Sequence, residues 1–173
     1  MRVKSLVLAA AVAAAAAGRA AAELALEGVH WQVGRVEHAR VVAWQDVRVV
    51  ADGPPRLANR LRVHLLLRNR GAKPAEGVLL RYSMTARLAP GQGAVAEGTW
   101  AIPFSVDEKR IPLVGPAKTV EVTLETSPAL DLYLRRLARA GWWPDRLKMQ
   151  VMLEPHPGAE TIQTGEDVVE LQR

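Results

Sequence analysis

The sequence predicts an all-β protein: an antiparallel β-sandwich of about seven to eight short strands, with one short helix at about residues 128–140 between two late strands. Three observations support this fold class. Several stretches alternate apolar and polar residues with period two, which is typical of strands that bury one face. Clusters of Gly, Pro, Asn and Asp separate these stretches at intervals of roughly ten residues. The elements follow the order strands, helix, strands, without the strand–helix alternation that builds a parallel sheet.

Residues 1–22 have the features of a secretory signal peptide. Arg2 and Lys4 precede an uncharged apolar run, and three alanines before Glu23 offer a small-residue cleavage site. The run is shorter than the roughly 20 apolar residues of a membrane span, so we expect cleavage after Ala20 or Ala22 and no stable membrane span afterwards. Because no cysteine follows the run, we expect no lipid attachment of the lipoprotein type.

Residues 23–173 are expected to form one domain, located in the periplasm or outside the cell. Removing the signal peptide takes away Arg2, Lys4 and Arg19, which lowers the net charge from +5 to +2. A small surplus of scattered arginines favours a solvated mixed-charge surface over a nucleic-acid partner. The chain has no cysteine, so its stability must come from a hydrophobic core and not from disulfides.

Two strands are expected between Glu23 and Val50, where the valines fall in conflicting phases around Trp44. Such a conflict is typical of a bulge or of a strand that changes sheets. The segment 52–55 (Asp-Gly-Pro-Pro) then breaks the chain.

The segment from Leu61 to Leu88 predicts a β-hairpin. Leu61, Val63, Leu65 and Leu67 alternate with polar residues in its first arm, and residues 78–88 alternate in its second. The turn residues Asn, Gly and Pro lie between them at 69–77.

Beyond the loop at 90–93, Trp100, Ile102, Phe104 and Val106 recur at spacing two and predict a strand, which Pro103 places at an edge or a bulge. Residues 107–110 are expected to form a charged turn. Residues 120–124 alternate cleanly and predict the next strand.

The only helical pattern starts at Ser127 and Pro128, an N-cap and first-turn pair, and closes at Gly141. One apolar stripe runs between them, and three arginines gather in the last turns, where they complement the macrodipole. A rigid corner at residues 142–145 and strands at 147–153 and 161–171 follow.

The stretch LRVHLLLRNRGAKPAEGVLLRYSM, residues 61–84, resembles the strand, Asn-x-Gly turn and second strand of bacterial exported immunoglobulin-like or fibronectin-type domains, including those related to cell adhesion. The resemblance implies an immunoglobulin-like β-sandwich that serves as a scaffold or binding module more often than as an enzyme. It provides no functional residues, and the chain lacks the two cysteines of true immunoglobulin domains.

Catalytic and cofactor motifs are absent from the sequence. It contains no Gly-x-Ser-x-Gly, His-Glu-x-x-His, phosphate-binding Gly-x-x-x-x-Gly-Lys or Gly-x-Gly-x-x-Gly pattern. Its four histidines lack ligand spacing, although distant strands could still bring His30 and His64 together. We therefore expect no catalytic, cofactor-binding or metal-binding residues.

The five tryptophans are the most informative side chains. Trp31 and Trp100 fall in the apolar phases of their strands and are expected in the core. Trp142 and Trp143 are adjacent at the corner after the helix, where one should point inward and the other should be partly exposed. With Arg139 and Asp145 they form the possible binding surface that the sequence predicts.

The leading hypothesis is an exported, non-catalytic immunoglobulin-like module of the bacterial cell envelope that acts through contacts with a protein partner. The alternative is a carbohydrate-binding module that uses exposed tryptophans at Trp142 and Trp143. The oligomeric state does not follow from the sequence.

Overall fold

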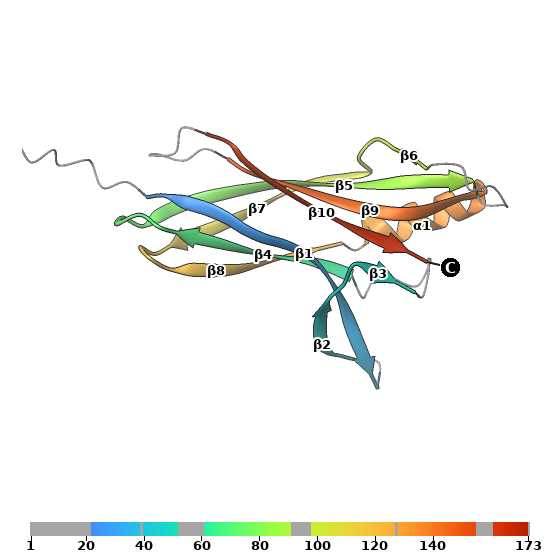
Figure 1. Ribbon diagram of the computed structural model, residues 1–173, viewed down its shortest axis with the longest axis horizontal. Helices are drawn as coiled ribbons and strands as arrows, with labels where there is room; N and C mark the ends of the chain where they lie inside the picture. Colours follow the sequence, from blue (N-terminus) through green and yellow to red (C-terminus); the bar gives the residue numbers. More distant parts are fainter. Residues whose placement is uncertain are drawn as a thin grey trace, which may run out of the picture.

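The computed structural model describes residues 22–38, 40–51, 61–90, 98–126, 128–154 and 161–172. Within these residues, two β-sheets lie face to face and a helix lies at one end of them (Figure 1). The prediction of a mostly β protein is confirmed. The predicted signal peptide (except Ala22), the turn at 52–55, the loop after Pro90, Ser127 and His156 fall outside the described residues.

The four-stranded sheet has the order β2 (Arg40–Asp46), β1 (Leu24–Glu37), β4 (Leu61–Asn69) and β8 (Thr119–Glu125). The six-stranded sheet has the order β3 (Val49–Val50), β10 (Gln163–Leu171), β9 (Trp142–Leu153), β5 (Ala75–Pro90) and β6 (Thr99–Trp100), with β7 (Ser105–Val114) also paired to β5. Two of these ten strands, β3 and β6, have only two residues each, and period-two alternation cannot reveal such short strands. All pairs are antiparallel except β3–β10, which is parallel and corrects the purely antiparallel prediction.

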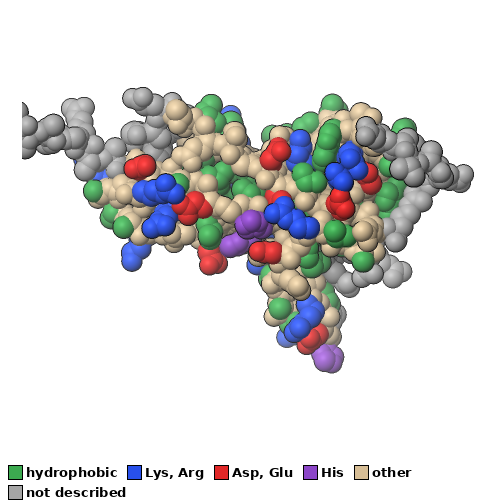
Figure 2. Space-filling view, in the orientation of Figure 1, with side chains coloured by type: hydrophobic (Ala, Val, Ile, Leu, Met, Phe, Trp, Pro, Cys, Tyr) green, Lys and Arg blue, Asp and Glu red, His purple; other side chains and the backbone are tan. Residues whose placement is uncertain are grey.

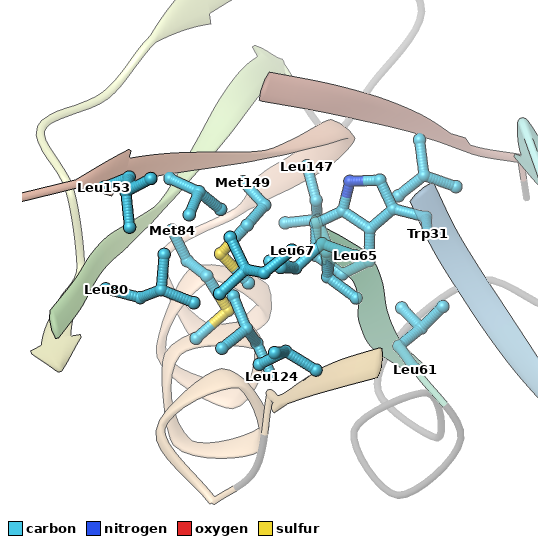
Figure 3. Close-up of a cluster of buried hydrophobic side chains, with 14 of the residues drawn as sticks. Trp31, Leu61, Leu65, Leu67, Leu80, Met84, Leu124, Leu147, Met149 and Leu153 are labelled. Carbon is cyan, nitrogen blue, oxygen red and sulfur yellow. The ribbon is translucent and has the colours of Figure 1, made fainter. Parts of the chain in front are cut away.

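The core lies between the two sheets and is made by the alternation that the sequence predicts. In β4 the inward-facing side chains are Leu61, Val63, Leu65 and Leu67. They meet inward-facing side chains of β5, β8 and β9, including Leu80, Met84, Leu124, Leu147, Met149 and Leu153 (Figure 3). Burying this apolar surface is the main favourable contribution to folding.

The predicted hairpin between Leu61 and Leu88 is wrong, although both of its strands exist. β4 pairs with β1 and β8, whereas β5 pairs with β6, β7 and β9, so the two arms lie in different sheets. Their apolar faces meet across the core. Alternation identifies which face of a strand is buried but does not distinguish a partner beside the strand from one facing it.

Buried Asn69 holds the chain in place where it crosses between the sheets. Its Oδ1 accepts hydrogen bonds from the backbone N–H groups of Glu23 (3.2 Å) and Gly71 (2.9 Å). Its Nδ2 donates to the carbonyl oxygens of Lys73 (2.7 Å) and Val114 (3.0 Å). One side chain thus joins the residue before β1, the β4–β5 connection and β7.

Another inter-sheet contact lies where β1 meets β10. The buried carboxylate of Asp167 accepts hydrogen bonds from the Trp31 backbone N–H (2.9 Å) and from Arg48 (2.5 Å), and the Trp31 indole donates to the Asp167 carbonyl (3.0 Å). Gly165 permits this approach, because a Cβ there would lie 2.8 Å from Val29 Cγ2. These contacts fasten one edge of the sandwich.

Helix α1 (Ala129–Arg139) is close to the predicted range of about 128–140 and lies between β8 and β9 as expected. It buries Leu130, Leu134 and Leu137 and contacts β9. Gly141 closes it with a φ of 76°, the left-handed conformation predicted for it. No helix among the described residues is long and apolar enough to cross a membrane.

Three predictions for residues 100–110 are wrong. Trp100 is 38% exposed instead of buried. Residues 107–110 belong to β7 and are not a turn. The expected strand from Trp100 to Val106 is divided between β6 and β7, with Pro103 between them, so the period-two pattern there does not correspond to one continuous buried face.

The segment from Glu23 to Val50 contains three strands and not the two expected. The phase conflict around Trp44, which predicted either a bulge or a change of sheet, coincides with both, since β2 belongs to the four-stranded sheet and β3 to the six-stranded one. A register shift opposite Arg35 and Val36 adds a bulge in the β1–β2 pair. Beyond the body of the sandwich, β2 and the end of β1 form a projecting arm (Figure 1). Charged side chains and a histidine lie at its tip (Figure 2).

Candidate functional site

A groove of about 480 Å³ lies on the outer face of the six-stranded sheet. Its walls come from β5, β9 and β10, with one residue of β7. We call it the outer groove; residues that line it include Arg81, Ser83, Val106, Gln150, Met152 and Glu166. These residues point outward because their strand neighbours Leu80, Met84, Met149 and Val151 point into the core.

Neighbouring side chains already pair the charged groups of the outer groove. Arg81 forms an ion pair with Glu154 at 2.7 Å. Gln150 Nε2 donates a hydrogen bond of 3.1 Å to Glu166, and the Lys148 ammonium lies 4.0 Å from the same carboxylate. The groove therefore has fixed polar walls beside the apolar Val106 and Met152, an arrangement suited to positioning a ligand.

An aromatic platform lies beside the outer groove. The Lys148 ammonium sits 4.7 Å from the centroid of the Trp100 ring, which is a cation–π distance. In the sheet, Lys148 lies opposite Thr85 of β5 and Val168 of β10. Lys148 is two residues from Gln150 on β9, so the two side chains are neighbours on the outer face. Trp100 is thus the exposed tryptophan next to the groove, although the sequence pattern predicted it in the core.

The four residues of the sequence-predicted surface do not form one site. Trp142 and Trp143 are the first residues of β9, and consecutive strand residues point to opposite faces. Trp143 and Asp145 belong to the outer face, where the Asp145 carboxylate accepts hydrogen bonds from Arg87 Nε at 3.0 and 3.1 Å. Trp142 is in the opposite phase of β9 and is exposed, as is Arg139 near the end of α1.

The expected corner at residues 142–145 is part of β9 and contains a bulge. Register pairs Leu88 with Pro144 and Arg87 with Arg146, so Asp145 is the additional residue. A bulge accommodates a proline in a strand, because the local ladder is already interrupted. Trp142 is exposed and Trp143 is half-buried on the outer face, so neither ring belongs to the buried core and the expectation that one of them points inward is wrong.

Two tyrosines have perturbed acidity. Burial raises the pKa of Tyr82 above its ordinary value, and the nearby Asp107 carboxylate, which shares a hydrogen bond with the phenol, raises it further. Burial also raises the pKa of Tyr133, which stacks on Phe104 with 4.1 Å between ring centroids. Both phenols are therefore neutral at physiological pH and cannot act as phenolate nucleophiles there.

His30 and His64 are brought together, as the sequence analysis allowed. They are cross-strand partners in the β1–β4 pair, and His64 Nε2 lies 3.6 Å from the Glu121 carboxylate. They lie on the outer face of the four-stranded sheet, because their strand neighbours Trp31 and Val63 are buried in the core. A patch of histidine colour lies near the centre of Figure 2. Within the described ranges, no three His, Asp or Glu side chains form a group that could hold a metal ion.

The described serines and the paired histidines are also far from a catalytic arrangement. Ser83 and Ser105 belong to the six-stranded sheet, whereas His30 and His64 belong to the four-stranded sheet. A nucleophile and its base must lie within hydrogen-bond reach of each other. The described part of the chain therefore offers no Ser–His pair among these residues.

Sequence reasoning missed the outer groove. The sequence feature that could have indicated the groove is a set of small or polar residues at the outward positions of β5 and β9, such as Ser83 and Gln150. These residues lie between longer charged side chains. That pattern is the same as an ordinary solvated strand face. Only the register of β5, β9 and β10 shows that these residues are neighbours.

No protein-family model and no curated protein matches the chain. Among solved structures, it is similar to the alkylpurine DNA glycosylase AlkC of Pseudomonas fluorescens (11% identity, TM-score 0.43, covering 88% of this chain and 31% of that chain). A β-D-glucoside glucohydrolase from Trichoderma reesei (12%, 0.42, 87% and 19%) and the sporulation control protein Spo0M of Bacillus subtilis (10%, 0.36, 86% and 50%) are also similar. The chain spans less than a third of the first two proteins. At these TM-scores the similarities carry no argument about function.

Proposed function

We propose that this chain is an exported, non-catalytic immunoglobulin-like module of the bacterial cell envelope that binds a protein partner through the outer groove. The groove is the observation that carries the proposal. Its volume of about 480 Å³ lies within the range of roughly 300–1,000 Å³ that is typical of small-molecule pockets, so it has room for side chains of a partner. Its apolar and polar walls would accept an extended segment of a partner.

The strand order supports an immunoglobulin-like fold. In such domains, strands A, B and E share one sheet and strands C, F and G share the other, and variable-type domains add C′ beside C. Here β1, β4 and β8 would be A, B and E, while β5, β7, β9 and β10 would be C, C′, F and G. The crossing between β4 and β5 would then be the ordinary passage from B to C.

The signal-peptide pattern supports export. Ala22, one of the two candidate cleavage positions, is buried in the core. Cleavage after Ala20 would therefore keep Ala22 in the folded protein, whereas cleavage after Ala22 would remove this core residue. Sequencing the N-terminus of the protein from envelope fractions tests this point, and a protein found intact in the cytoplasm would contradict export.

Site-specific photo-crosslinking tests the binding surface. A benzoyl-phenylalanine at Ser83, in the groove, should give a discrete adduct in envelope fractions, and the same probe at the exposed Thr119 of the opposite sheet should not. A Met152→Glu change should abolish the adduct because it adds a charge to the apolar wall. Equal adducts from both positions, or turnover of ester, glycoside or phosphate substrates by the purified protein, would contradict the proposal.

The exposed Trp100 favours carbohydrate binding as the second candidate function. Tryptophan rings stack on the apolar faces of sugars, and Glu166 and Gln150 nearby could pair with hydroxyl groups. A glycan array followed by tryptophan fluorescence titration tests this alternative. A saturable change that Trp100→Ala abolishes and Trp142→Ala preserves would favour it over protein binding, and no change with any glycan would remove it.

A further inference from the structure

An exposed surface of unusual composition lies at the helix end of the molecule. Leu132, Arg136 and Arg139 follow one another at i, i+4 and i+7, so they share one face of α1. Trp142 follows Arg139 by three residues, which span at most about 11 Å. All four side chains are exposed, and we call them the helix-end surface.

The two arginines of this surface have no acidic partner among the described residues. Arg135, on the neighbouring part of the helix, is paired with Asp131 at 2.8 Å. No ion pair of Arg136 or Arg139 occurs within the described ranges. Their position in the last turn complements the helix dipole, but a dipole leaves their outward-facing charges available to an external anion.

The apolar members of the surface have no role in the core. Leu130, Leu134 and Leu137 supply the buried stripe of α1, whereas Leu132 is 52% exposed. Trp142 is 45% exposed, although Trp31 is completely buried. Macrodipole complementarity explains arginines at a helix end, but it does not explain large exposed apolar side chains beside them.

A further exposed apolar residue lies at the same end. The stack of Phe104 on Tyr133 places the segment before β7 against α1. Ile102, two residues before Phe104, is 85% exposed. Figure 1 shows β6 and α1 at the same end of the molecule.

We propose that the helix-end surface is a peripheral docking site for an anionic lipid membrane. Tryptophan prefers the interface of a bilayer, and arginine can keep its guanidinium at the phosphates while its stem lies along apolar groups. The exposed Leu132, Trp142 and Ile102 favour a lipid surface over an acidic protein or a nucleic acid, because lipids offer an apolar layer beneath their phosphates. The buried leucines of α1 stay in the core, so the contact is made by side chains and not by insertion of the helix.

Such docking is expected to be weak and sensitive to salt. Each basic side chain near an anionic leaflet contributes only modestly, and the attraction declines over a Debye length. The proposal does not depend on the outer groove, since the helix-end surface shares none of its residues.

Vesicle flotation tests the proposal with the full chain and two charge-matched double variants. Arg136→Glu/Arg139→Glu reverses two charges on the helix-end surface, and Arg68→Glu/Arg110→Glu reverses two exposed arginines on β4 and β7. We expect binding to vesicles with equal parts phosphatidylglycerol and phosphatidylcholine to fall by about tenfold or more in the first variant. The second variant should bind nearly as well as the unaltered chain.

Lipid quenching supplies an independent readout. Brominated anionic lipid should quench tryptophan fluorescence in the unaltered chain, and Trp142→Phe should remove most of that quenching while leaving the circular dichroism melt unchanged. Equal loss of binding in both double variants, equal binding to pure phosphatidylcholine, or quenching that persists in Trp142→Phe would overturn the proposal. Binding to polyglutamate without binding to vesicles would overturn it in favour of an acidic protein.

Discussion

Asn69 shows how one side chain can determine a connection between two sheets. It is completely buried, and its two polar atoms make four hydrogen bonds to backbone groups. A buried amide is tolerated only when its hydrogen bonds are satisfied. Asparagine was visible in the sequence as a turn residue, but its role between sheets was not.

Replacing Asn69 by Ala should lower the free energy of unfolding by about 1–3 kcal/mol, because buried backbone groups lose their partners. Denaturant unfolding of the variant measures this loss. The neighbouring change Arg70→Ala is the control, since it removes an exposed ion pair with Glu27 and should cost less than about 1 kcal/mol. Similar losses from both changes would contradict the role of Asn69.

The raised pKa of Tyr82 predicts a loss of stability at alkaline pH. Burial, followed by the charge of Asp107, raises the pKa of Tyr82 in the folded protein above that of an unfolded tyrosine, about 10. The unfolded chain therefore ionises first as pH rises. The stability contributed by the neutral phenol is complete below pH of about 10 and is lost as pH rises through the pKa of the folded state.

Urea unfolding at pH values below and above 10 should show this loss, and Tyr82→Phe should reduce its steepness. Absorbance titration of the phenolate provides the direct measurement. In Tyr82→Phe only Tyr133 remains of the chain's two tyrosines, and its pKa is also raised by burial. A folded protein whose phenols both titrate at about 10 would contradict the prediction.

At the scale of elements, β4 and β5 demonstrate the strength and the limit of alternation. Their inward and outward faces are those that period two predicts, and Leu65 and Leu80 are both completely buried. Their partners are different from those expected, because β4 and β5 pack face to face instead of side by side. Short-range turn signals do not specify whether a chain folds back in one sheet or crosses to the other.

Leu65→Ala and Leu80→Ala should each cost about 2–5 kcal/mol in the free energy of unfolding, since each leaves a cavity between the sheets. Denaturant melts measure both values. Leu113→Ala on β7 serves as the control, because Leu113 is an exposed leucine and its loss should change stability little. A cost below about 1 kcal/mol at either core position would contradict the packing described above.

The helix and the segment from Trp100 to Val106 give opposite results for sequence reasoning. The apolar stripe and the closing Gly141 predicted α1 well, because helix signals are local. Trp100 had the right phase for burial, but the register pairs it with Arg87, whose neighbour Ala86 is buried, so Trp100 lies on the outer face of the six-stranded sheet. A local pattern does not reveal which of its two phases faces the opposite sheet.

At the scale of the whole molecule, the contact between Asp167 and Trp31 joins residues that are 136 positions apart. The Asp167 carboxylate replaces a strand partner for the backbone N–H of Trp31 and also binds Arg48. This contact fastens β1 of one sheet to β10 of the other. The sequence contained no signal for it, since an acidic residue in a final strand is usually solvated.

Asp167→Ala should lower the free energy of unfolding by about 1–3 kcal/mol and accelerate hydrogen exchange at the Trp31 amide, because that buried N–H loses its acceptor. Glu170→Ala is the matched control on the same strand. It removes a half-exposed ion pair with Arg146 and should cost less than about 1 kcal/mol. Unchanged exchange at Trp31 in Asp167→Ala would contradict the proposed fastening.

The sequence by itself determined the all-β class, the helix between late strands, the buried faces of β4, β5, β8 and β9, and an irregularity of the strands near Trp44. These features depend on residues close together in the chain, where periodicity and turn chemistry act. The tertiary structure alone decided the pairing of strands, the outer groove, the exposure of Trp100 and the separation of Trp142 from Trp143. Each of these depends on which distant strands become neighbours, and that choice is made by packing across the core and by buried side chains such as Asn69 and Asp167.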